Sequence, residues 1–267
     1  VLVTLRFYAT GSYQEITGSN IFTAISQPCV SRCITEVTDS LNQPNIFNDW
    51  VKFPETIQEM ESLRRRSANS VIGLADCTHV AIAAPTGNEY PEHIYVNRKH
   101  YHSINVQLIC NEKLEIMNVD GRFQGSCHYM HIWKQNRVAG IVESVYRQNT
   151  SNVFYLLGYS VNVAEERFDS RIKAVRSGIE KCNGVLKNRF RCLLKHRVLH
   201  YRPDRAGKII NACVVLHNMC VKTNMSETEE NPIEGADLLK LSNMERSNDP
   251  RLVNPDPLIS MIINVVF

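Results

Sequence analysis

The 267-residue sequence lacks several features by which proteins are placed in familiar classes. Its nine cysteines include no C-x-x-C pair, which argues against a zinc ribbon or a thioredoxin-type motif and favours reduced thiols packed as small hydrophobic side chains. No apolar run reaches the roughly 18 residues of a membrane span, and the first residues show no secretory signal. Because 43% of the residues are apolar, we expect a globular protein with a substantial core that does not span a membrane.

A strong excess of charge of one sign is also missing, since the formal net charge is only +3. The charges are nevertheless unevenly distributed. Residues 165–208 hold 13 Lys and Arg against 5 Asp and Glu, whereas residues 227–256 hold 8 acidic residues against 3 basic ones. The basic block is typical of a surface that faces a polyanion, and the acidic segment is typical of a solvated tail. A solvated helix face would give the same basic pattern.

The N-terminal part of the chain contains a pattern compatible with a helix-turn-helix. A short helical piece in 13–26 leads through a tight turn into a helix within 24–42, whose apolar residues recur at spacings of 4, 3 and 4 and form one stripe. This stripe consists of Val30, Ile34, Val37 and Leu41. The other face offers Gln27, Ser31 and Arg32 to DNA phosphates or base edges, although a helical hairpin packed on a core has the same pattern.

From residue 71 onward the periodicity changes from helix to strand and then back to helix. In the second strand Asn105 and Gln107 alternate with apolar residues, which predicts that one face of this strand is wetter. Trp133, in the helix that follows the third strand, is expected to anchor the core. Three strands, a helix, a strand and then long helices fit an α/β layer architecture. The predicted strands cover 71–85, 102–110, 113–123 and 153–160, and the predicted helices cover 53–70, 131–149, 169–194 and 205–223.

A single carboxylate, Asp76, interrupts the apolar run at 71–85. Burying part of a charge is costly unless another group pairs with it. An acid in a first strand recurs in enzymes that cut phosphodiester bonds with two divalent cations, because Mg²⁺ takes oxygen ligands and a pair of ions activates water and stabilises the leaving oxygen. Such a site needs a second carboxylate from the neighbouring strand and a third from a later helix.

Several blocks of this sequence resemble, in the same order, those of the Harbinger-type DDE transposases and the nucleases derived from them. The blocks are "GLADCTHVAIAAP", "YVNRKHYHSINVQLIC", "GRFQGSCHYMHIW", "LLGYS", "GIEKCNGVLKNRFRCL" and "IINACVVLHNMC", and "AISQPCVSRCI" resembles the helix-turn-helix of that family. The resemblance runs from about residue 5 to residue 222.

The resemblance implies an α/β fold with an RNase H-like mixed sheet flanked by helices. The nuclease-type domain is expected at 66–222, after a helix-turn-helix-like region at 1–65. Because the sequence has no initiator Met, we expect that this region can be a fragment of a longer one. An acidic, mobile tail is expected at 223–267. The family also implies a divalent-metal DNA endonuclease in the nucleus, with the cytoplasm as a second location, and DNA and a DNA-binding protein as partners.

The family motifs assign two catalytic, metal-binding residues in this chain. Asp76 matches the first catalytic aspartate, in "DCTH", and Glu180 in "GIEK" matches the glutamate of the late helix. The resemblance therefore implies that these two carboxylates bind Mg²⁺ or Mn²⁺. Lys187, Arg189 and Arg191 follow in the same basic segment and are expected to hold the DNA backbone.

The chain departs from the family at the second catalytic aspartate, where "LLGYS" carries Tyr159. A phenol has an unperturbed pKa near 10, so it is a neutral and weak metal ligand at pH 7. Tyr129 replaces another family aspartate, and His100 replaces a glycine. Asp120, about two strand spacings from the first strand, and Asp169 after the shortened connection are poor replacements for the lost carboxylate.

Two other groups of metal-ligand residue types have simpler explanations. His79 in "DCTH" is expected to cap the strand at the edge of the core, with the orientation of a ligand or phosphate as the alternative. Cys127, His128 and His131 lack a second ligand pair at zinc spacing. Three hypotheses for the whole chain stay open: an active metal-dependent endonuclease, a DNA- or protein-binding remnant without catalysis, and a decaying copy with no maintained role.

Overall fold

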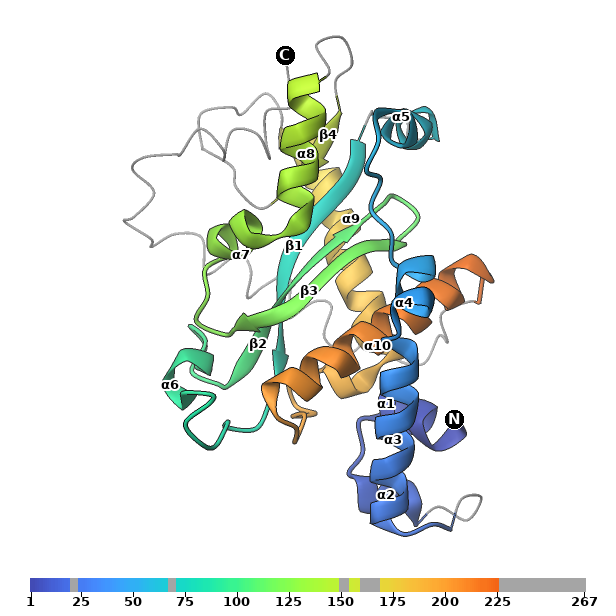
Figure 1. Cartoon of the computed structure of the whole chain (residues 1–267), viewed down its shortest axis with the longest axis vertical. Helices are drawn as coiled ribbons and strands as arrows, with labels where there is room; N and C mark the ends of the chain where they lie inside the picture. The colour runs from blue at the N-terminus through green and yellow to red at the C-terminus, as the bar shows by residue number, and fades with distance from the viewer. Residues whose placement is uncertain (20–23, 67–70, 149–153, 159–168, 226–267) are drawn as a thin grey trace.

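The computed structural model describes residues 1–19, 24–66, 71–148, 154–158 and 169–225 (Figure 1). Its centre is a four-stranded sheet with the order β3-β2-β1-β4. The strands are β1 (Val71–Ala81), β2 (Ser103–Cys110), β3 (Ile116–Gln124) and β4 (Tyr155–Leu157). β2 pairs antiparallel with both β1 and β3, whereas β4 pairs parallel with β1. This is the RNase H-like mixed sheet that the resemblance predicted.

Helices cover both faces of the sheet, and each face has its own hydrophobic core. One face packs against α9 (Asp169–Arg189) and α10 (Pro203–Lys222), and the other against α5 (Ile57–Arg66), α7 (Tyr129–Gln135) and α8 (Arg137–Gln148). Trp133 of α7 is 6% exposed in the second core, which confirms its predicted role as an anchor. Because both faces are covered, β1 reads as a nearly continuous apolar run.

The expectation of a wetter face on β2 is wrong, because every residue of this strand is buried. Asn105 is 5% exposed and Gln107 is 4% exposed. The Nδ2 atom of Asn105 donates to the carbonyl oxygen of Cys127 at 2.8 Å, and Oε1 of Gln107 accepts from Nδ2 of Asn136 at 2.7 Å. The polar residues therefore mark buried hydrogen bonds to the start and end of α7 and not contact with water.

The single helix predicted over 131–149 is two helices, α7 and α8, separated at Asn136. Asn136 has an extended backbone, with φ −76° and ψ 134°, and its Oδ1 accepts a hydrogen bond from the backbone nitrogen of Val138 at 2.9 Å. This side chain satisfies one of the free amide groups at the start of α8, as an N-cap does. The predicted helix at 169–194 is likewise shorter: α9 ends at Arg189, and a 3₁₀ turn, η2 (Arg191–Leu193), follows.

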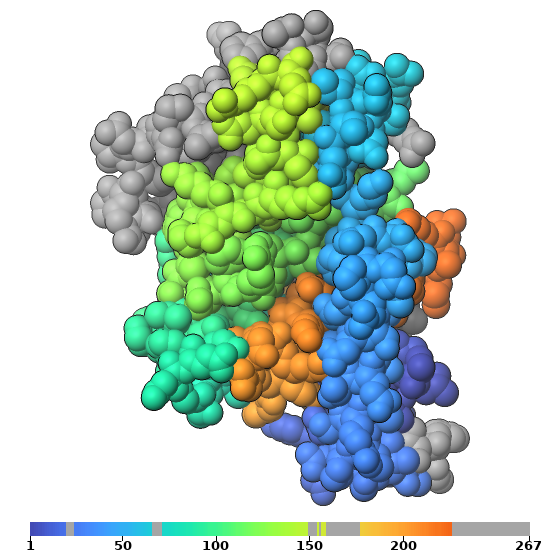
Figure 2. Space-filling model, in the orientation of Figure 1, coloured from blue at the N-terminus to red at the C-terminus, as the bar shows by residue number. Residues whose placement is uncertain are grey.

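Four helices form the N-terminal region: α1 (Leu2–Thr10), α2 (Gln14–Gly18), α3 (Gln27–Leu41) and α4 (Pro44–Trp50). Val30 and Ile34 of the predicted stripe are fully buried in the core that contains α9 and α10, and Leu41 packs against that core. Figure 2 shows α3 and α4 lying against α10 on one face of the molecule. The helical region therefore packs directly on the body that contains the sheet.

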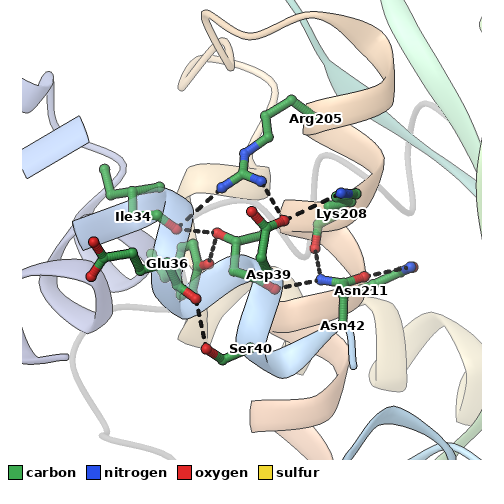
Figure 3. A network of polar contacts seen from close by, with 10 residues as sticks. Ile34, Glu36, Asp39, Ser40, Asn42, Arg205, Lys208 and Asn211 are labelled. Carbon is green, nitrogen blue, oxygen red and sulfur yellow. Dashed lines mark hydrogen bonds and ion pairs between the residues drawn. The ribbon is translucent and has the colours of Figure 1, made fainter. Parts of the chain in front are cut away.

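A polar network joins α3 to α10 (Figure 3). Oδ1 of Asp39 lies 2.7 Å from Nη1 of Arg205 and 3.2 Å from Nζ of Lys208. One turn further, Nδ2 of Asn42 donates to the carbonyl oxygen of Lys208 at 2.9 Å and its Oδ1 accepts from Nδ2 of Asn211 at 3.1 Å. These contacts fix the direction of α3 on α10, whereas the buried stripe supplies most of the free energy of packing.

The remaining described helix is α6 (Glu92–Tyr95), in the connection between β1 and β2. Within the described part of the chain, no helix is long and apolar enough to cross a membrane. Most of the predicted acidic tail, from residue 226 to the end, lies outside the described residues.

Candidate functional site

β1 and α9 together position Asp76. Leu74, Asp76 and Thr78 alternate along β1 and point toward α9, as three contacts between the two elements demonstrate. The helix approaches closely because Gly178 has no side chain: a Cβ atom there would lie 2.8 Å from Cδ1 of Leu74. α9 therefore runs along β1 in the same direction (Figure 1). Asp76 lies near the middle of β1.

The carboxylate of Asp76 is partly buried and is oriented by two hydrogen bonds. Its Oδ1 accepts from the backbone nitrogen of Cys77 at 2.8 Å, and its Oδ2 accepts from Nδ2 of Asn183 at 3.4 Å. The second bond is long, so Asn183 holds the carboxylate only weakly. Asn183 of α9 is therefore one of the groups that pair with the Asp76 carboxylate.

Glu180 lies three residues before Asn183 on α9 and is partly buried. Residues three apart on a helix are neighbours on one face. The fold therefore places both predicted metal ligands, Asp76 and Glu180, at the contact between β1 and α9. Sequence reasoning missed Asn183, although its spacing from Glu180 is the signal that would have found it.

Lys187 continues the same face of α9, four residues after Asn183. Its Nζ donates to Oγ1 of Thr78 at 2.8 Å and to the carbonyl oxygen of His79 at 2.9 Å. Burial lowers the pKa of Lys187 to about 8, although the negative charge of Asp76 opposes this shift. The lysine expected to hold DNA thus reaches into the site and puts a positive charge beside Asp76.

His79 is held at the edge of the sheet by Ser103 and Asn97. Its Nδ1 lies 3.0 Å from Oγ of Ser103, which also accepts from Nδ2 of Asn97 at 2.8 Å. Burial and the nearby charges of Lys187 and Lys99 lower the pKa of His79 to about 4, so its ring is neutral at pH 7. His79 therefore lies near the end of β1 and is held there by hydrogen bonds to neighbouring residues.

The turn after Asn97 places His100 in a conformation that favours glycine, which is the residue that the family resemblance predicts at this position. The backbone nitrogen of His100 donates to the carbonyl oxygen of Asn97, and His100 has φ +58°, in the left-handed region. A residue with a Cβ atom adopts this conformation at a cost of roughly 1 kcal/mol. The turn is thus formed in this chain despite the substitution.

Asp120 lies on β3, which β2 separates from β1, as predicted for a carboxylate unable to share an ion with Asp76. Its two oxygens accept from Nε and Nη2 of Arg122 at 2.8 and 2.7 Å. Tyr129 is the first residue of α7. The centroids of its ring and of the His128 ring lie 4.2 Å apart. Within the described ranges, no group of three or more His, Cys, Asp and Glu side chains is arranged to hold a metal ion.

Tyr159 lies outside the described residues, as does the side chain of Asp169. That Asp169 is a poor replacement for the lost carboxylate therefore stays a prediction.

The other predicted DNA-binding residues are spread over two surfaces. On α3, Gln27 and Arg32 are exposed and Ser31 is partly buried. Near the end of α9, Nη2 of Arg189 donates to the carbonyl oxygen of Met225 at 3.0 Å, and Arg191 is exposed in η2. The structure does not bring these two groups into one cluster with the side chain of Lys187.

Two short basic segments that sequence reasoning missed meet at the end of β1. The two segments are joined because Nζ of Lys195 lies 4.9 Å from the ring centroid of Tyr101. They lie close to the site, since the charge of Lys99 acts on both His79 and Lys187. The signal was the pair of tripeptides "RKH" and "KHR". We call these segments the basic rim, which consists of the exposed residues Arg98, Lys99, His100, Lys195, His196 and Arg197.

Comparison of the sequence with known proteins identifies the family. Residues 75–218 match the model of the DDE superfamily endonuclease family. The chain is 31% identical over 242 residues to the human protein named "Putative nuclease HARBI1", which covers 84% of this chain and 67% of the human one. It is 31% identical over 252 residues to the bovine protein of that name, with 88% and 70% covered, and 30% identical over 247 residues to the Xenopus laevis protein, with 86% and 69% covered.

No solved structure matches the chain. The family match covers more than half of the sequence, and it includes Asp76, Glu180 and the helix that carries Asn183 and Lys187. The chain therefore belongs to the DDE superfamily endonucleases, as a nuclease derived from Harbinger-type transposases.

Proposed function

We propose that this chain is a divalent-metal-dependent DNA endonuclease whose cleavage activity is strongly impaired by Tyr159. The observation that carries the proposal is the contact of Asp76 with Asn183, because it places Asp76 against the helix that carries Glu180, three residues before Asn183. Phosphodiester cleavage at a carboxylate-bound cation needs acidic side chains from neighbouring elements, and Asp76 on β1 and Glu180 on α9 are the two that we propose for this role.

The residues present fit a hard cation. Asp76 and Glu180 supply carboxylate oxygens, which Mg²⁺ and Mn²⁺ prefer as ligands. When bound, the cation would polarise a phosphate oxygen and lower the pKa of a coordinated water. The nearby ammonium of Lys187 attracts the negative charge of Asp76, and the hydrogen bonds from Cys77 and Asn183 direct its oxygens.

Impairment follows from the chemistry of position 159. An aspartate there would bring a third negative ligand to the site, whereas a tyrosine is neutral at pH 7 because its unperturbed pKa is near 10. Its side chain is also larger than that of aspartate. We expect cation affinity and the cleavage rate to be low for both reasons.

The basic rim supports DNA as the substrate. A duplex carries closely spaced phosphates, and each phosphate that Lys or Arg neutralises adds affinity that depends on salt. The rim offers four Lys and Arg side chains beside the end of β1 that carries His79. The exposed face of α3, with Gln27 and Arg32, is a second surface for DNA, and nuclear localisation would follow from such a substrate.

A second candidate function is DNA or protein binding without cleavage. The observation that favours it is Lys187, whose ammonium already occupies the space near Asp76 with a positive charge. In this case the carboxylates would serve the fold, and DNA or a DNA-binding partner protein would dock on the same surfaces.

One experiment separates the two candidates: nicking of supercoiled plasmid with Mn²⁺ by four proteins. We expect slow nicking by the unaltered chain, none by Asp76→Asn, and nicking at least tenfold faster by Tyr159→Asp than by the matched control Tyr159→Phe. Equal rates for the two Tyr159 variants would remove tyrosine as the cause of impairment. Binding of DNA without nicking that depends on Asp76 in any variant would favour the second candidate.

A further inference from the structure

We propose that His79 is a neutral hydrogen-bond donor to a phosphate oxygen of the DNA backbone, and that its Nε2–H group anchors a strand that lies on the basic rim. The inference rests on the proposed function, because it takes DNA as the substrate. It deepens that function by naming a contact without charge, which adds affinity and leaves the salt dependence of binding unchanged.

A buried relay of polar groups begins at Asn97. Its Oδ1 accepts from the backbone nitrogens of Lys99 at 2.8 Å and Tyr101 at 3.4 Å. These two donors fix which end of the carboxamide is the oxygen, because a half-turn would bring two N–H groups against an NH₂ group. The nitrogen end therefore faces Ser103, and Nδ2 of Asn97 donates to Oγ of Ser103 at 2.8 Å.

Ser103 passes this direction on to His79. Ser103 is fully buried, and within the described part of the chain its hydroxyl group has two partners, Nδ2 of Asn97 and Nδ1 of His79 at 3.0 Å. Since Asn97 donates to the hydroxyl oxygen, Nδ1 is the acceptor for the hydroxyl hydrogen. A proton on Nδ1 would leave that hydrogen buried without an acceptor, which is costly.

The proton of the neutral His79 ring is therefore on Nε2. The ring is neutral at pH 7 because burial and the charges of Lys187, Lys99 and Arg98 lower the pKa of His79 to about 4. Within the described ranges Nε2 has no hydrogen-bond partner, and it is not one of the buried polar atoms without a partner. Nε2–H is thus a donor that is open to solvent, with its direction set by the relay.

The surroundings of this donor suit an anion. The charges that shift the pKa of His79 are all positive, and they come from α9 and from the segment after Asn97. The ring centroid of Tyr101 lies 6.4 Å from that of His79 and 4.9 Å from Nζ of Lys195, so Tyr101 joins the donor to the basic rim. A DNA phosphate supplies both an acceptor oxygen and a negative charge at this place.

His79 is separate from the carboxylates of the candidate metal site. It follows Asp76 by three residues in β1, and side chains an odd number of residues apart leave a strand on opposite faces. At about 3.3 Å per residue, the Cα atoms of Asp76 and His79 lie about 10 Å apart. The phosphate at His79 is therefore a different one from any phosphate that is bound at Asp76.

The test is binding of a fluorescein-labelled DNA duplex, measured by fluorescence anisotropy at several salt concentrations. His79→Phe keeps a ring beside Tyr101 and removes the donor. We expect its binding to be about tenfold weaker at every salt concentration, with an unchanged slope of log K against log salt, because a neutral donor releases no counterion. His131→Phe makes the same change at an exposed position of α7 and should bind as the unaltered chain does.

Two further variants separate the donor from a structural role. His79→Gln carries a neutral amide N–H that reaches the place of Nε2, so we expect it to bind DNA about as tightly as the unaltered chain. His79→Asn has a shorter amide that stays near Ser103, so it should show the tenfold loss, including where His79→Phe fails to fold. Imidazole ¹⁵N NMR of the unaltered chain at pH 7 should show His79 protonated on Nε2, which tests the relay without DNA.

Each other outcome counts against a defined part of the proposal. Unchanged binding in His79→Phe and His79→Asn would overturn the contact and leave DNA as the substrate. Equal losses in His79→Gln and His79→Phe would assign the effect to the end of β1 and overturn the donor, and a smaller salt slope would overturn its neutrality. A proton on Nδ1 would overturn the relay. No DNA binding by the unaltered chain would overturn this inference together with DNA as the substrate.

Discussion

Nζ of Lys187 lies 2.8 Å from Oγ1 of Thr78, so that a charged hydrogen bond fastens α9 to β1 just beyond Asp76. A lysine this well enclosed requires acceptors and a compensating charge. Thr78 and the carbonyl group of His79 supply the acceptors, and Asp76 supplies the charge. The same ammonium therefore stabilises the junction and sets the electrostatic potential of the candidate site.

Replacing Lys187 by Met should destabilise the fold by about 2 kcal/mol, because Thr78 and His79 lose a charged donor while the aliphatic stem is retained. The same change at Lys181, an exposed residue of α9, should alter the free energy of unfolding by less than about 0.5 kcal/mol. Urea denaturation measures both. Equal effects at the two positions would show that the contacts of Lys187 with Thr78 and His79 do not add to the free energy of unfolding.

Two glycines of α9 should respond to alanine in opposite directions. A Cβ atom added at Gly184 would meet no described atom within 4 Å, so Gly184→Ala should stabilise the protein by about 1 kcal/mol through helix propensity. At Gly178 the new Cβ would lie 2.8 Å from Cδ1 of Leu74, and overpacking of this kind costs about 1–3 kcal/mol. Thermal melting of the two variants measures the difference.

Adding Leu74→Ala to Gly178→Ala supplies the control for the second effect. The smaller side chain makes room for the methyl group, so the penalty of Gly178→Ala should be smaller in this background than in the unaltered chain. A penalty that is the same in both backgrounds would mean that the close approach of α9 to β1 does not depend on this glycine.

Stability should fall when the pH is lowered through the range in which His79 titrates. The pKa of His79 is about 4 in the folded protein and about 6.5 in an unfolded chain. Between these values the unfolded chain binds a proton that the folded chain does not, so acid favours unfolding, with a loss of up to about 3 kcal/mol near pH 4 and almost none well above pH 6.5.

The pH dependence is checked by chemical denaturation at several pH values between 4 and 7. His79→Asn keeps a polar group near Ser103 and has no proton to gain, so the slope of the unfolding free energy against pH should be smaller in this variant. An unchanged slope would assign the effect to other groups.

The basic rim should account for part of the salt dependence of DNA binding. Lys99→Ala combined with Lys195→Ala removes two charges, so the affinity should fall and the slope of log K against log salt should decrease by about 2. Lys113→Ala combined with Lys134→Ala removes two exposed charges elsewhere on the surface and serves as the control. Fluorescence anisotropy with a duplex measures both, and equal losses in the two double variants would contradict a specific role for the rim.

The sheet order and the helices on its two faces could be predicted because the apolar spacing and the family blocks carry that information over many residues. Burial of Asn105 and Gln107 could not, because a polar residue that hydrogen-bonds to a covering helix has the same pattern as one that faces water. The division between α7 and α8 depends on the side chain of one residue, Asn136, and local propensity does not show it.

The candidate site was predictable in its ligands and less so in its surroundings. Asp76 and Glu180 follow from motifs, but the depth to which Lys187 enters the site and the contact made by Asn183 depend on how α9 is laid along β1. That placement is a tertiary property, set by contacts such as the one at Gly178. The spacing of the three α9 residues alone would also fit a helix facing solvent.

The packing of α3 on α10 has a consequence for any DNA that this chain engages. The ion pair of Asp39 with Arg205 and the buried stripe of α3 tie that helix directly to the body of the protein. A duplex held on the outer face of α3 would thus meet Asp76 at one distance and one angle. The distance between the DNA bound at α3 and the candidate site would be fixed. A cut, where one is made, would therefore fall at a constant number of base pairs from the bound sequence.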